Sequence, residues 1–539
     1  MLQFAVYDQD GLPPDDWPLR NAYLIGADGS PLRAEIAYEE QRIVCDKREP
    51  GTAALFLQHD ARDLGCVTLQ TCLLPERNEP YLLTLELARH RLMVLYTRLE
   101  EWSMFDLPAD HRVPKRAERA RGLFIEALCL QRSDPVQASR VAQECLASAL
   151  DGSEELALAH SELLLNRRRE TQAIPDHPFG VGLAPASVQV PEPAEPRLRS
   201  TLATNFDVMH LAVPWRRLCP QENEYDWSLT DRWLDWAQEA GVPVVMGPLV
   251  SFDPLNLPDW LYIWEHDYDT VRDVIYEHLE RVIDRYAGVV FGWNVLSGLH
   301  INQHFTFNFE QLMDLTRMVL MLTRKLHPQG QLFVELRQPF GEYYATNQRS
   351  IPPLIYADLL AQSGVNFDAY LLRMPMGQAV PGQFTRDLMQ FSVLLEQYAV
   401  FGKPIHLTCA APSQPVSSVM IADPKEEQPV DADCGFWRRP WSPTVQSHWL
   451  EAICQVAMSK PYIESIVWQD FVDHPTMELP LSGLISENLQ VRDALRRLVG
   501  FRRTLLNQPG PEGLEDTQNE PPSDINSDSR MGDKVRAPV

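Results

Sequence analysis

The chain has 539 residues, more than a single hydrophobic core usually organises, so we expect two or three domains. Hydrophobic residues make up 45% of the chain, which is enough to bury sizeable cores. The formal net charge of −26 argues against a nucleic-acid-binding surface, because phosphate binding requires clustered lysine and arginine. Such an acidic excess is typical of a soluble protein.

The start of the chain and its cysteines indicate a cellular compartment. Residues 1–8 have neither the basic region nor the apolar run of a signal peptide, and no apolar stretch approaches the roughly 20 residues that cross a membrane. The nine cysteines are scattered without a C-x-x-C pair, so we expect no metal and no other cofactor. The sequence therefore predicts a cytoplasmic protein with reduced thiols and without a membrane partner.

The N-terminal region is predicted to contain two parts. Residues 1–80 hold short apolar runs between turns rich in Gly, Pro, Asp and Asn, which predicts a small β-rich domain, plausibly a sandwich. Residues 81–175 are predicted to be a helical connector, since apolar residues recur at helical spacing over 81–104. Two further helices are expected near 114–131 and 135–168.

From residue 176 to residue 506, short apolar segments alternate with amphipathic helices. This pattern is typical of a parallel sheet buried on both faces, and eight such units predict a closed (β/α)8 TIM barrel. The candidate strands are 180–184, 206–213, 242–250, 289–295, 332–336, 367–373, 404–408 and 463–468. The last residues, 507–539, are rich in Pro, Gly, Asp and Ser and are predicted to be a disordered acidic tail.

Polar and aromatic residues follow several of the predicted strands, at the end of the barrel where ligands bind. Aromatic rings can stack on sugar faces, and arginine can bind hydroxyl and carboxylate groups. For the tryptophans the alternative is packing in the core or at the rim, and Glu335 could pair with Arg373. The candidates are Trp215, Asp253, Asn294, Ser297, His300, Glu335, Arg373, Trp468, Asp470 and Asp473.

A long connection after the seventh predicted strand, from Ala410 to Trp441, carries the segment Phe436-Trp437-Arg438-Arg439-Pro440-Trp441. One interpretation is a lid or a platform on which Trp437 and Trp441 stack against a glycan. The other is a loop that fixes itself to the barrel through these tryptophans.

Three segments resemble motifs of glycoside hydrolase family 10, the xylanase-type barrels. Trp293-Asn-Val-Leu-Ser-Gly298 resembles the Trp-Asp-Val-Val-Asn-Glu that carries the acid/base glutamate of the family. Pro404-Ile-His-Leu-Thr-Cys409 resembles the segment that supplies the nucleophile, and Trp468-Gln-Asp470 with Asp473 resembles the motif of the last strand. The resemblance extends over most of residues 178–500 and implies a TIM barrel of this family with a carbohydrate ligand.

The chain departs from the family pattern at the functional positions. The acid/base glutamate aligns with Gly298, and the nucleophile aligns with Cys409. A retaining glycosidase needs two carboxyl groups about 5–5.5 Å apart across the scissile bond. The standard mechanism is therefore predicted to be lost.

Three functions remain compatible with this sequence, and we favour the first. It is a divergent family member that binds an oligosaccharide or polysaccharide without cleaving it. The second is an active O-glycosyl hydrolase with relocated carboxylates, Glu335 with Asp470 or Asp473. The third is a non-catalytic intracellular scaffold. The residues expected to bind the glycan are Trp215, Asn294, His300, Arg373, Trp437, Trp441 and Trp468.

Overall fold

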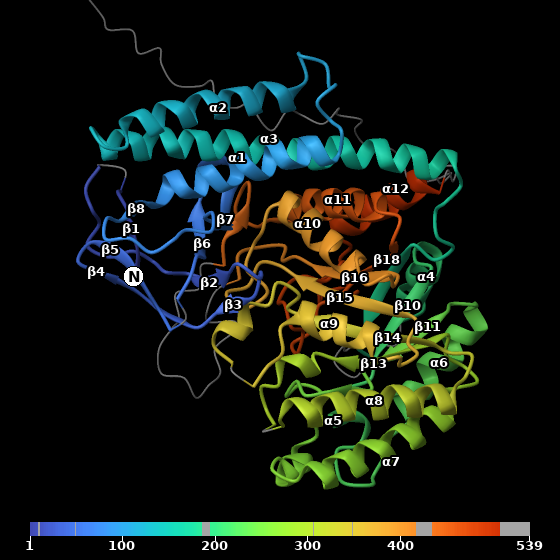
Figure 1. Cartoon of the computed structure of the whole chain (residues 1–539). Helices are drawn as coiled ribbons and strands as arrows, with labels where there is room; N and C mark the ends of the chain where they lie inside the picture. The colour runs from blue at the N-terminus through green and yellow to red at the C-terminus, as the bar shows by residue number, and fades with distance from the viewer. Residues whose placement is uncertain are drawn as a thin grey trace, which may run out of the picture.

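The computed structural model describes residues 1–8, 11–48, 50–185, 195–305, 307–347, 349–416 and 434–506 (Figure 1). The predicted acidic tail and the middle of the predicted long loop lie outside these ranges. A β-rich region, a layer of long helices and a barrel follow one another along the chain.

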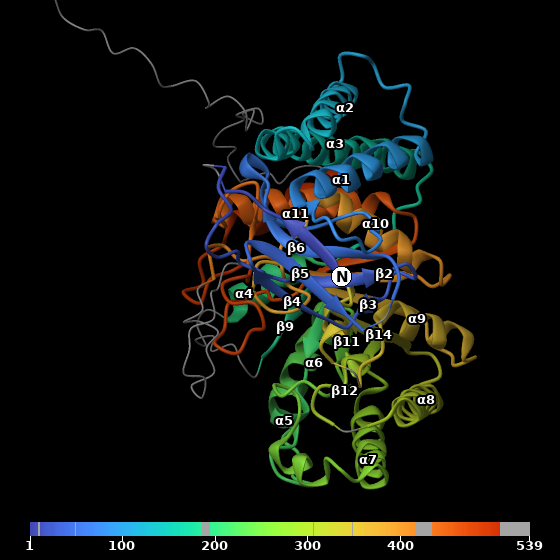
Figure 2. The same cartoon turned by 60° about the vertical axis from the view of Figure 1, so that its left-hand side comes forward.

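The N-terminal region contains two small sheets, which Figure 2 shows in front of the barrel. One sheet has the order β4-β5-β1-β8 and the other the order β17-β7-β6-β2-β3. Both sheets share an apolar core with the long helices. The strands are β1 (Leu2–Ala5), β2 (Tyr23–Gly26), β3 (Pro31–Leu32), β4 (Ala34–Glu39), β5 (Arg42–Lys47), β6 (Ala53–Asp60), β7 (Gly65–Gln70) and β8 (Tyr81–Leu82).

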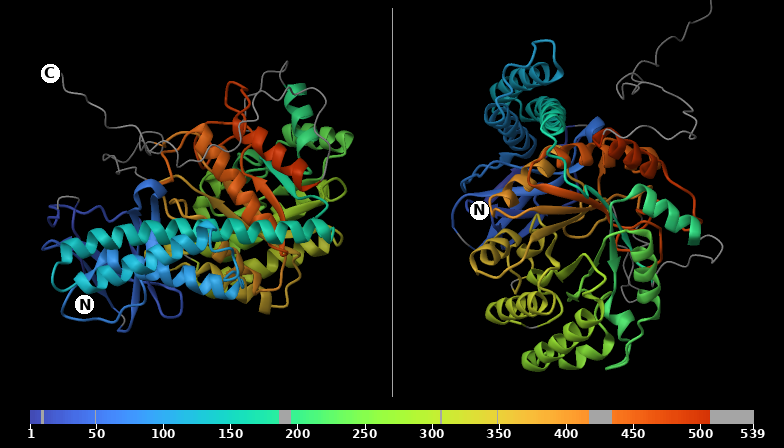
Figure 3. Two further views of the ribbon diagram at one scale, coloured as in Figure 1. Left: turned by 90° about the horizontal axis from the view of Figure 1, so that it is seen from above. Right: turned by 90° about the vertical axis from the view of Figure 1, so that its right-hand side faces the viewer.

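The three predicted helices of the next region are present as α1 (Leu83–Glu101), α2 (Arg112–Leu130) and α3 (Pro135–Glu170). The Asp134 carboxylate caps α3 by accepting a hydrogen bond from the backbone of Gln137. Helix α3 extends along both the N-terminal sheets and the barrel (Figure 3, left). Helix α3 therefore packs against both the N-terminal region and the barrel.

The barrel is closed and parallel, which confirms the predicted TIM fold (Figure 3, right). β11 pairs with β13 and β18 pairs with β9, so the ring has no open edge. Each predicted segment overlaps one of the eight barrel strands, and the segment 242–250 also reaches β12. The strands are β9 (Phe179–Leu183), β10 (Val208–Ala212), β11 (Val244–Gly247), β13 (Gly292–Ser297), β14 (Gln331–Arg337), β15 (Ala369–Pro375), β16 (Ile405–Ala410) and β18 (Ile463–Trp468).

Helices surround these strands and cover their outer faces. The helices are α4 (Glu195–Asn205), α5 (Trp215–Leu218), α6 (Ser228–Ala240), α7 (Tyr268–Tyr286), α8 (Phe309–Leu326), α9 (Pro353–Gln362), α10 (Leu388–Ala399), α11 (Pro443–Ser459) and α12 (Asp493–Leu505). Two short strands complete the region, β12 (Val250–Ser251) and β17 (Phe436–Trp437). None of the helices in the described ranges combines the length and the apolar character required to span a bilayer.

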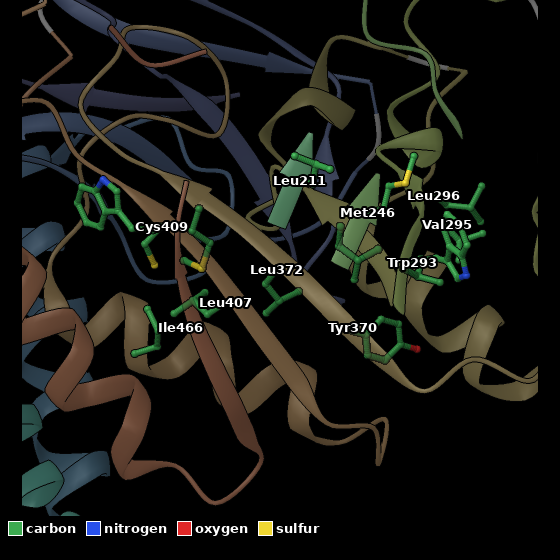
Figure 4. Close-up of a cluster of buried hydrophobic side chains, with 14 of the residues drawn as sticks. Leu211, Met246, Trp293, Val295, Leu296, Tyr370, Leu372, Leu407, Cys409 and Ile466 are labelled. Carbon is green, nitrogen blue, oxygen red and sulfur yellow. The ribbon is translucent and has the colours of Figure 1, made fainter. Parts of the chain in front are cut away.

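Successive side chains on each barrel strand point to opposite sides, as the strand geometry requires. The side chains that face the helices form one large core; those in Figure 4 include Leu211, Met246, Trp293, Leu372, Leu407, Cys409 and Ile466. A smaller cluster fills the barrel interior and contains Val208, Val245, Phe333, Ala369 and Leu371. A Cβ atom at Gly182 would lie 1.9 Å from the carbonyl oxygen of Gln469, so glycine permits the close approach of β9 to the end of β18.

The strand β17 comes from the long loop after β16, but it belongs to the N-terminal sheet. Phe436 pairs with Cys66 and Trp437 with Gly65 in antiparallel register. The barrel thus contributes a strand to the N-terminal region, and the two regions are joined by backbone hydrogen bonds.

Replacing a tryptophan of the large core tests how much the barrel depends on it. The Trp293 side chain is 0% exposed and donates a hydrogen bond to His327. We expect Trp293→Ala to lower the free energy of unfolding by about 3–5 kcal/mol, because the cavity it leaves is only partly refilled. Urea denaturation measures the change. The matched control, Trp264→Ala, removes a tryptophan that is 37% exposed, and an equal loss in both variants would contradict the prediction.

Candidate functional site

A cavity of about 430 Å³ opens at the carboxyl ends of the barrel strands. The side chains that line it are mostly charged or polar, and among the described lining residues none is Trp, Tyr or Phe. They are Ala184, Ala212, Pro214, Arg216, Arg217, Pro248, Asp253, Leu255, Asn256, Ser297, Glu335, Arg337, Arg373, Gln469, Asp470, His474, Thr476, Met477 and Glu478.

Glu335, from β14, is 3% exposed and lines this cavity. Its carboxylate accepts hydrogen bonds from Asn294 Nδ2 at 2.6 Å and from Ser297 Oγ at 2.7 Å. Arg373 Nη1 lies 3.6 Å from Glu335 Oε1, so the ion pair anticipated from the sequence is present. Asn294, predicted to bind the glycan, instead holds the Glu335 carboxylate in place.

Glu478, which the sequence did not single out, accepts side-chain hydrogen bonds from three residues at the cavity. It accepts hydrogen bonds from Arg337 Nη2 at 2.9 Å, Arg373 Nε at 2.7 Å and Gln383 Nε2 at 2.8 Å. Burial opposes its ionisation, but the two guanidinium groups outweigh burial and lower the pKa of Glu478 to about 2. Glu478 is therefore an anion at neutral pH.

Arg337 links this carboxylate to a second one. Burial alone would lower the pKa of the Arg337 guanidinium, but Glu478 and Asp253 together raise it. Arg337 donates to Asp253, which itself accepts a hydrogen bond from the backbone of Leu255 at 2.9 Å. Charges of alternating sign thus run from one wall of the cavity to the other.

The two aspartates predicted after β18 have different environments. Asp470 lines the cavity, where it accepts a hydrogen bond from Gln469 Nε2 at 3.2 Å and lies 3.3 Å from His474 Nε2. Asp473 is absent from the cavity lining; it pairs with Arg492 and accepts a hydrogen bond from the backbone of Gly483 at 2.8 Å. The structure therefore brings Glu335 and Asp470, but not Asp473, to one cavity.

The two tryptophans expected near strand ends lie in the packed interior. Trp215 is 3% exposed, with its ring stacked on His278 at 4.1 Å. Trp468 donates to the carbonyl oxygen of Ser482 at 2.8 Å and belongs to the core under the helices. Because side chains alternate along a strand, its neighbour Gln469 lines the cavity while Trp468 points away from it.

The tryptophans of the long loop are also buried away from the cavity. Trp437 donates to Glu154 Oε1 at 2.8 Å, and Trp441 donates to the carbonyl oxygen of Gly435 at 3.2 Å. Arg438 Nη2 lies 2.7 Å from Glu154 Oε2. Trp437 and Arg438 fix this end of the loop to helix α3, which the sequence did not anticipate, while both tryptophans also belong to the large core under the barrel helices. Neither tryptophan is among the residues that line the cavity.

His300 is buried next to Arg337, one of the residues that line the cavity. Its ring is 0% exposed, stacks on Tyr356 at 5.2 Å, and places Nε2 3.0 Å from the carbonyl oxygen of Arg337. Burial lowers the pKa of His300 to about 4, so the ring is neutral at pH 7. His300 thus contacts the end of β14 and is not among the residues that line the cavity.

Gly298 and Cys409 are the residues that the sequence resemblance aligns with the catalytic glutamates of the family. Gly298 has φ +67°, and a Cβ atom there would lie 3.0 Å from Arg337 Cδ, so the turn is adapted to glycine. Cys409 is 1% exposed and faces the helices, and burial raises the pKa of its thiol well above the usual value. Within the described ranges, no group of three His, Cys, Asp or Glu residues is arranged to hold a metal ion.

Comparison with known proteins gives one family match. Residues 177–308 match the sequence model of glycosyl hydrolase family 10, which covers β9 to the loop after β13. Endo-1,4-beta-xylanase A from Xylanibacter ruminicola is 26% identical over 109 residues, which are 19% of this chain and 29% of that protein. The matched part thus spans less than a third of this relative.

Solved structures of xylanases are similar to the barrel. Xylanase 10B from Thermotoga maritima is 15% identical, with a TM-score of 0.46, over 64% of this chain and 99% of that one. TsXylA, an intracellular xylanase from Thermoanaerobacterium saccharolyticum, is also 15% identical, with a TM-score of 0.44, over 61% of this chain and 97% of that one. The sequence match and the closed ring of eight parallel strands identify a (β/α)8 barrel of the glycosyl hydrolase family 10 type, which supports a carbohydrate-related function.

Proposed function

We propose that the barrel binds a carbohydrate in the cavity at its carboxyl end without hydrolysing it by the retaining mechanism of the family. The observation that supports this proposal is the state of the carboxylates in the cavity. Glu335, Asp253 and Glu478 are each bound to an arginine, and the two aligned catalytic positions hold a glycine and a buried cysteine.

Glycoside hydrolysis needs a protonated carboxylic acid that can give its proton to the leaving oxygen. An arginine partner favours the ionised form of a carboxylate and so works against that role. The low pKa of Glu478 means that this group carries no proton to donate at neutral pH. These groups are better suited to accept hydrogen bonds from sugar hydroxyls than to transfer protons.

The cavity offers polar partners for a sugar in place of aromatic platforms. Arg217 is exposed at the rim, lines the cavity, and makes no side-chain hydrogen bond or ion pair with the described residues. Asp470 and His474 lie on the neighbouring wall. Together these groups offer hydrogen-bond donors and acceptors, which can replace the water molecules bound to the hydroxyl groups of a sugar ring.

The relocated-carboxylate hydrolase is the second candidate, because Glu335 and Asp470 line the same cavity. Asp470 is bonded to Gln469 and His474, so its surroundings differ from those of the arginine-bound carboxylates. In this mechanism one of the pair would serve as acid and the other as base.

Incubation of the pure protein with xylo-oligosaccharides and a mixed glycan panel separates the candidates. We expect at least one glycan to raise the melting temperature, because a ligand that binds only the folded state stabilises it, and we expect no new reducing ends by mass spectrometry. Cleavage by the wild-type protein and by the exposed control Glu310→Gln, but not by Glu335→Gln, would establish the hydrolase instead. If the protein neither binds nor cleaves any glycan of the panel, the scaffold function remains.

The pH dependence of stability tests the charge network around Glu478. Its pKa is lowered in the folded state from 4.5 to about 2, so its stabilising contribution is complete above pH 4.5 and is lost as the pH falls towards 2. We expect Glu478→Gln to lower the free energy of unfolding by about 3 kcal/mol at pH 7, because two partly buried arginines each lose one of their two carboxylate partners, and by clearly less near pH 2.5. Urea denaturation at both pH values measures this difference. The exposed Glu487→Gln is the control; an equal loss at both pH values for Glu478→Gln would contradict the assignment.

A further inference from the structure

We infer that the cavity is a one-sided pocket that takes a short oligosaccharide or the end of a glycan chain, not a groove that holds the interior of a polysaccharide. This inference rests on the proposed carbohydrate binding and specifies which part of the ligand the site accepts. It comes from the positions of the loops at the carboxyl end of the barrel: some line the cavity, and others contact the N-terminal region.

One set of loops lines the cavity. The segments after β9, β10, β12 and β18 contribute Ala184, Arg217, Asn256 and Glu478, among others. The described residues of the loops after β14, β15 and β16 do not line the cavity. On this side the lining consists of Glu335 and Arg337, within β14, and Arg373, within β15. The exposed lining residues, Arg216, Arg217, Leu255 and Thr476, all belong to the segments after β10, β12 and β18, so the site is accessible from that side.

The loop after β14 is bound to the N-terminal sheets. Glu342 accepts a hydrogen bond from Asn21 Nδ2 at 3.0 Å and pairs with Arg386. The same Arg386 donates to the hydroxyl of Tyr23 on β2 at 3.0 Å. Glu342 is 5% exposed and Arg386 is 2% exposed, so this contact belongs to a buried interface.

The loops after β15 and β16 are bound to the same region. The backbone of Thr68 on β7 donates to the carbonyl oxygen of Thr385 at 2.9 Å. Arg91 of α1 donates to Asp387 at 3.0 Å in another buried ion pair. The loop after β16 supplies β17 to the N-terminal sheet. Each of the three loops therefore has described residues that are bound to the N-terminal part of the chain.

This interface continues to the edge of the cavity. Gln383, in the loop after β15, is 5% exposed and donates to Glu478 Oε1 at 2.8 Å. Its own carbonyl oxygen accepts a hydrogen bond from the backbone of Gly377 at 2.8 Å. The loop after β15, which is bound to the N-terminal region, thus also contacts the charged network of the site through Gln383.

The interface is fixed by buried pairs that are costly to separate. Removing one partner of a buried ion pair leaves the other charge unpaired in the interior, and the described residues of the interface include two such pairs, Arg91 with Asp387 and Arg386 with Glu342. A volume of about 430 Å³ lies within the range of small-molecule sites. A long glycan therefore has room for one end, while its remainder leaves through the accessible side.

Calorimetric titration with xylo- and cello-oligosaccharides of increasing length, from the monosaccharide to the hexasaccharide, tests this inference. We expect the affinity to rise up to the di- or trisaccharide and then to change by less than about twofold, because further units lie outside the pocket. A rise of about tenfold or more between trisaccharide and hexasaccharide, or about 1.4 kcal/mol, would overturn the one-sided pocket and leave carbohydrate binding intact. Absence of binding by every sugar would overturn both.

A pair of matched variants tests the direction of entry. Leu255 lines the cavity on its accessible side and is 51% exposed. We expect Leu255→Trp to weaken binding of the preferred oligosaccharide by about tenfold or more, because the larger ring obstructs the entrance. Leu163→Trp replaces a leucine on α3 that is 55% exposed and is expected to bind normally. Normal binding by a folded Leu255→Trp variant, checked by circular dichroism, would overturn the inferred entrance.

Discussion

The charged network at the mouth of the barrel is the constraint on which the site depends. Arg337 and Arg373 share Glu478, and each also pairs with a second carboxylate, Asp253 and Glu335 respectively. Charges this far from bulk water are tolerated only when partners of opposite sign satisfy them. The arrangement therefore fixes the ends of β14 and β15 and the loop after β18 relative to one another, and it sets the polarity of the cavity.

The packing of the barrel and the chemistry of its cavity depend on different residues. The core under the helices needs only apolar side chains at alternate strand positions, and these are kept on all eight strands. The sequence resemblance aligns Gly298 and Cys409 with the two catalytic carboxylates of the family, and the proposed loss of hydrolysis rests on that alignment. Fold and site are specified by different residues, so one can change while the other persists.

Sequence patterns predicted the eight barrel strands and the three long helices, because apolar periodicity is a local signal. They also located Glu335 and Arg373 at strand ends. Glu478 was missed because it lies in a loop without periodicity, and its importance arises only when two distant arginines reach it. The placement of Trp468 was not predictable from residue type, since one position along a strand decides whether a side chain faces the cavity or the helices. Trp215 lies in the short helix α5 after β10, where its ring stacks on His278, a contact between residues distant in the sequence.

The pairing of β17 with β7 has a consequence for the order in which the molecule forms. The paired residues are about 370 positions apart in the sequence, so a ribosome completes the rest of the N-terminal sheet long before it makes Trp437. Until then the β7 edge is an unpaired strand edge, which is a template for association with other chains. Synthesis of the last barrel loops covers that edge, and the N-terminal region reaches its final form only when most of the barrel has been made.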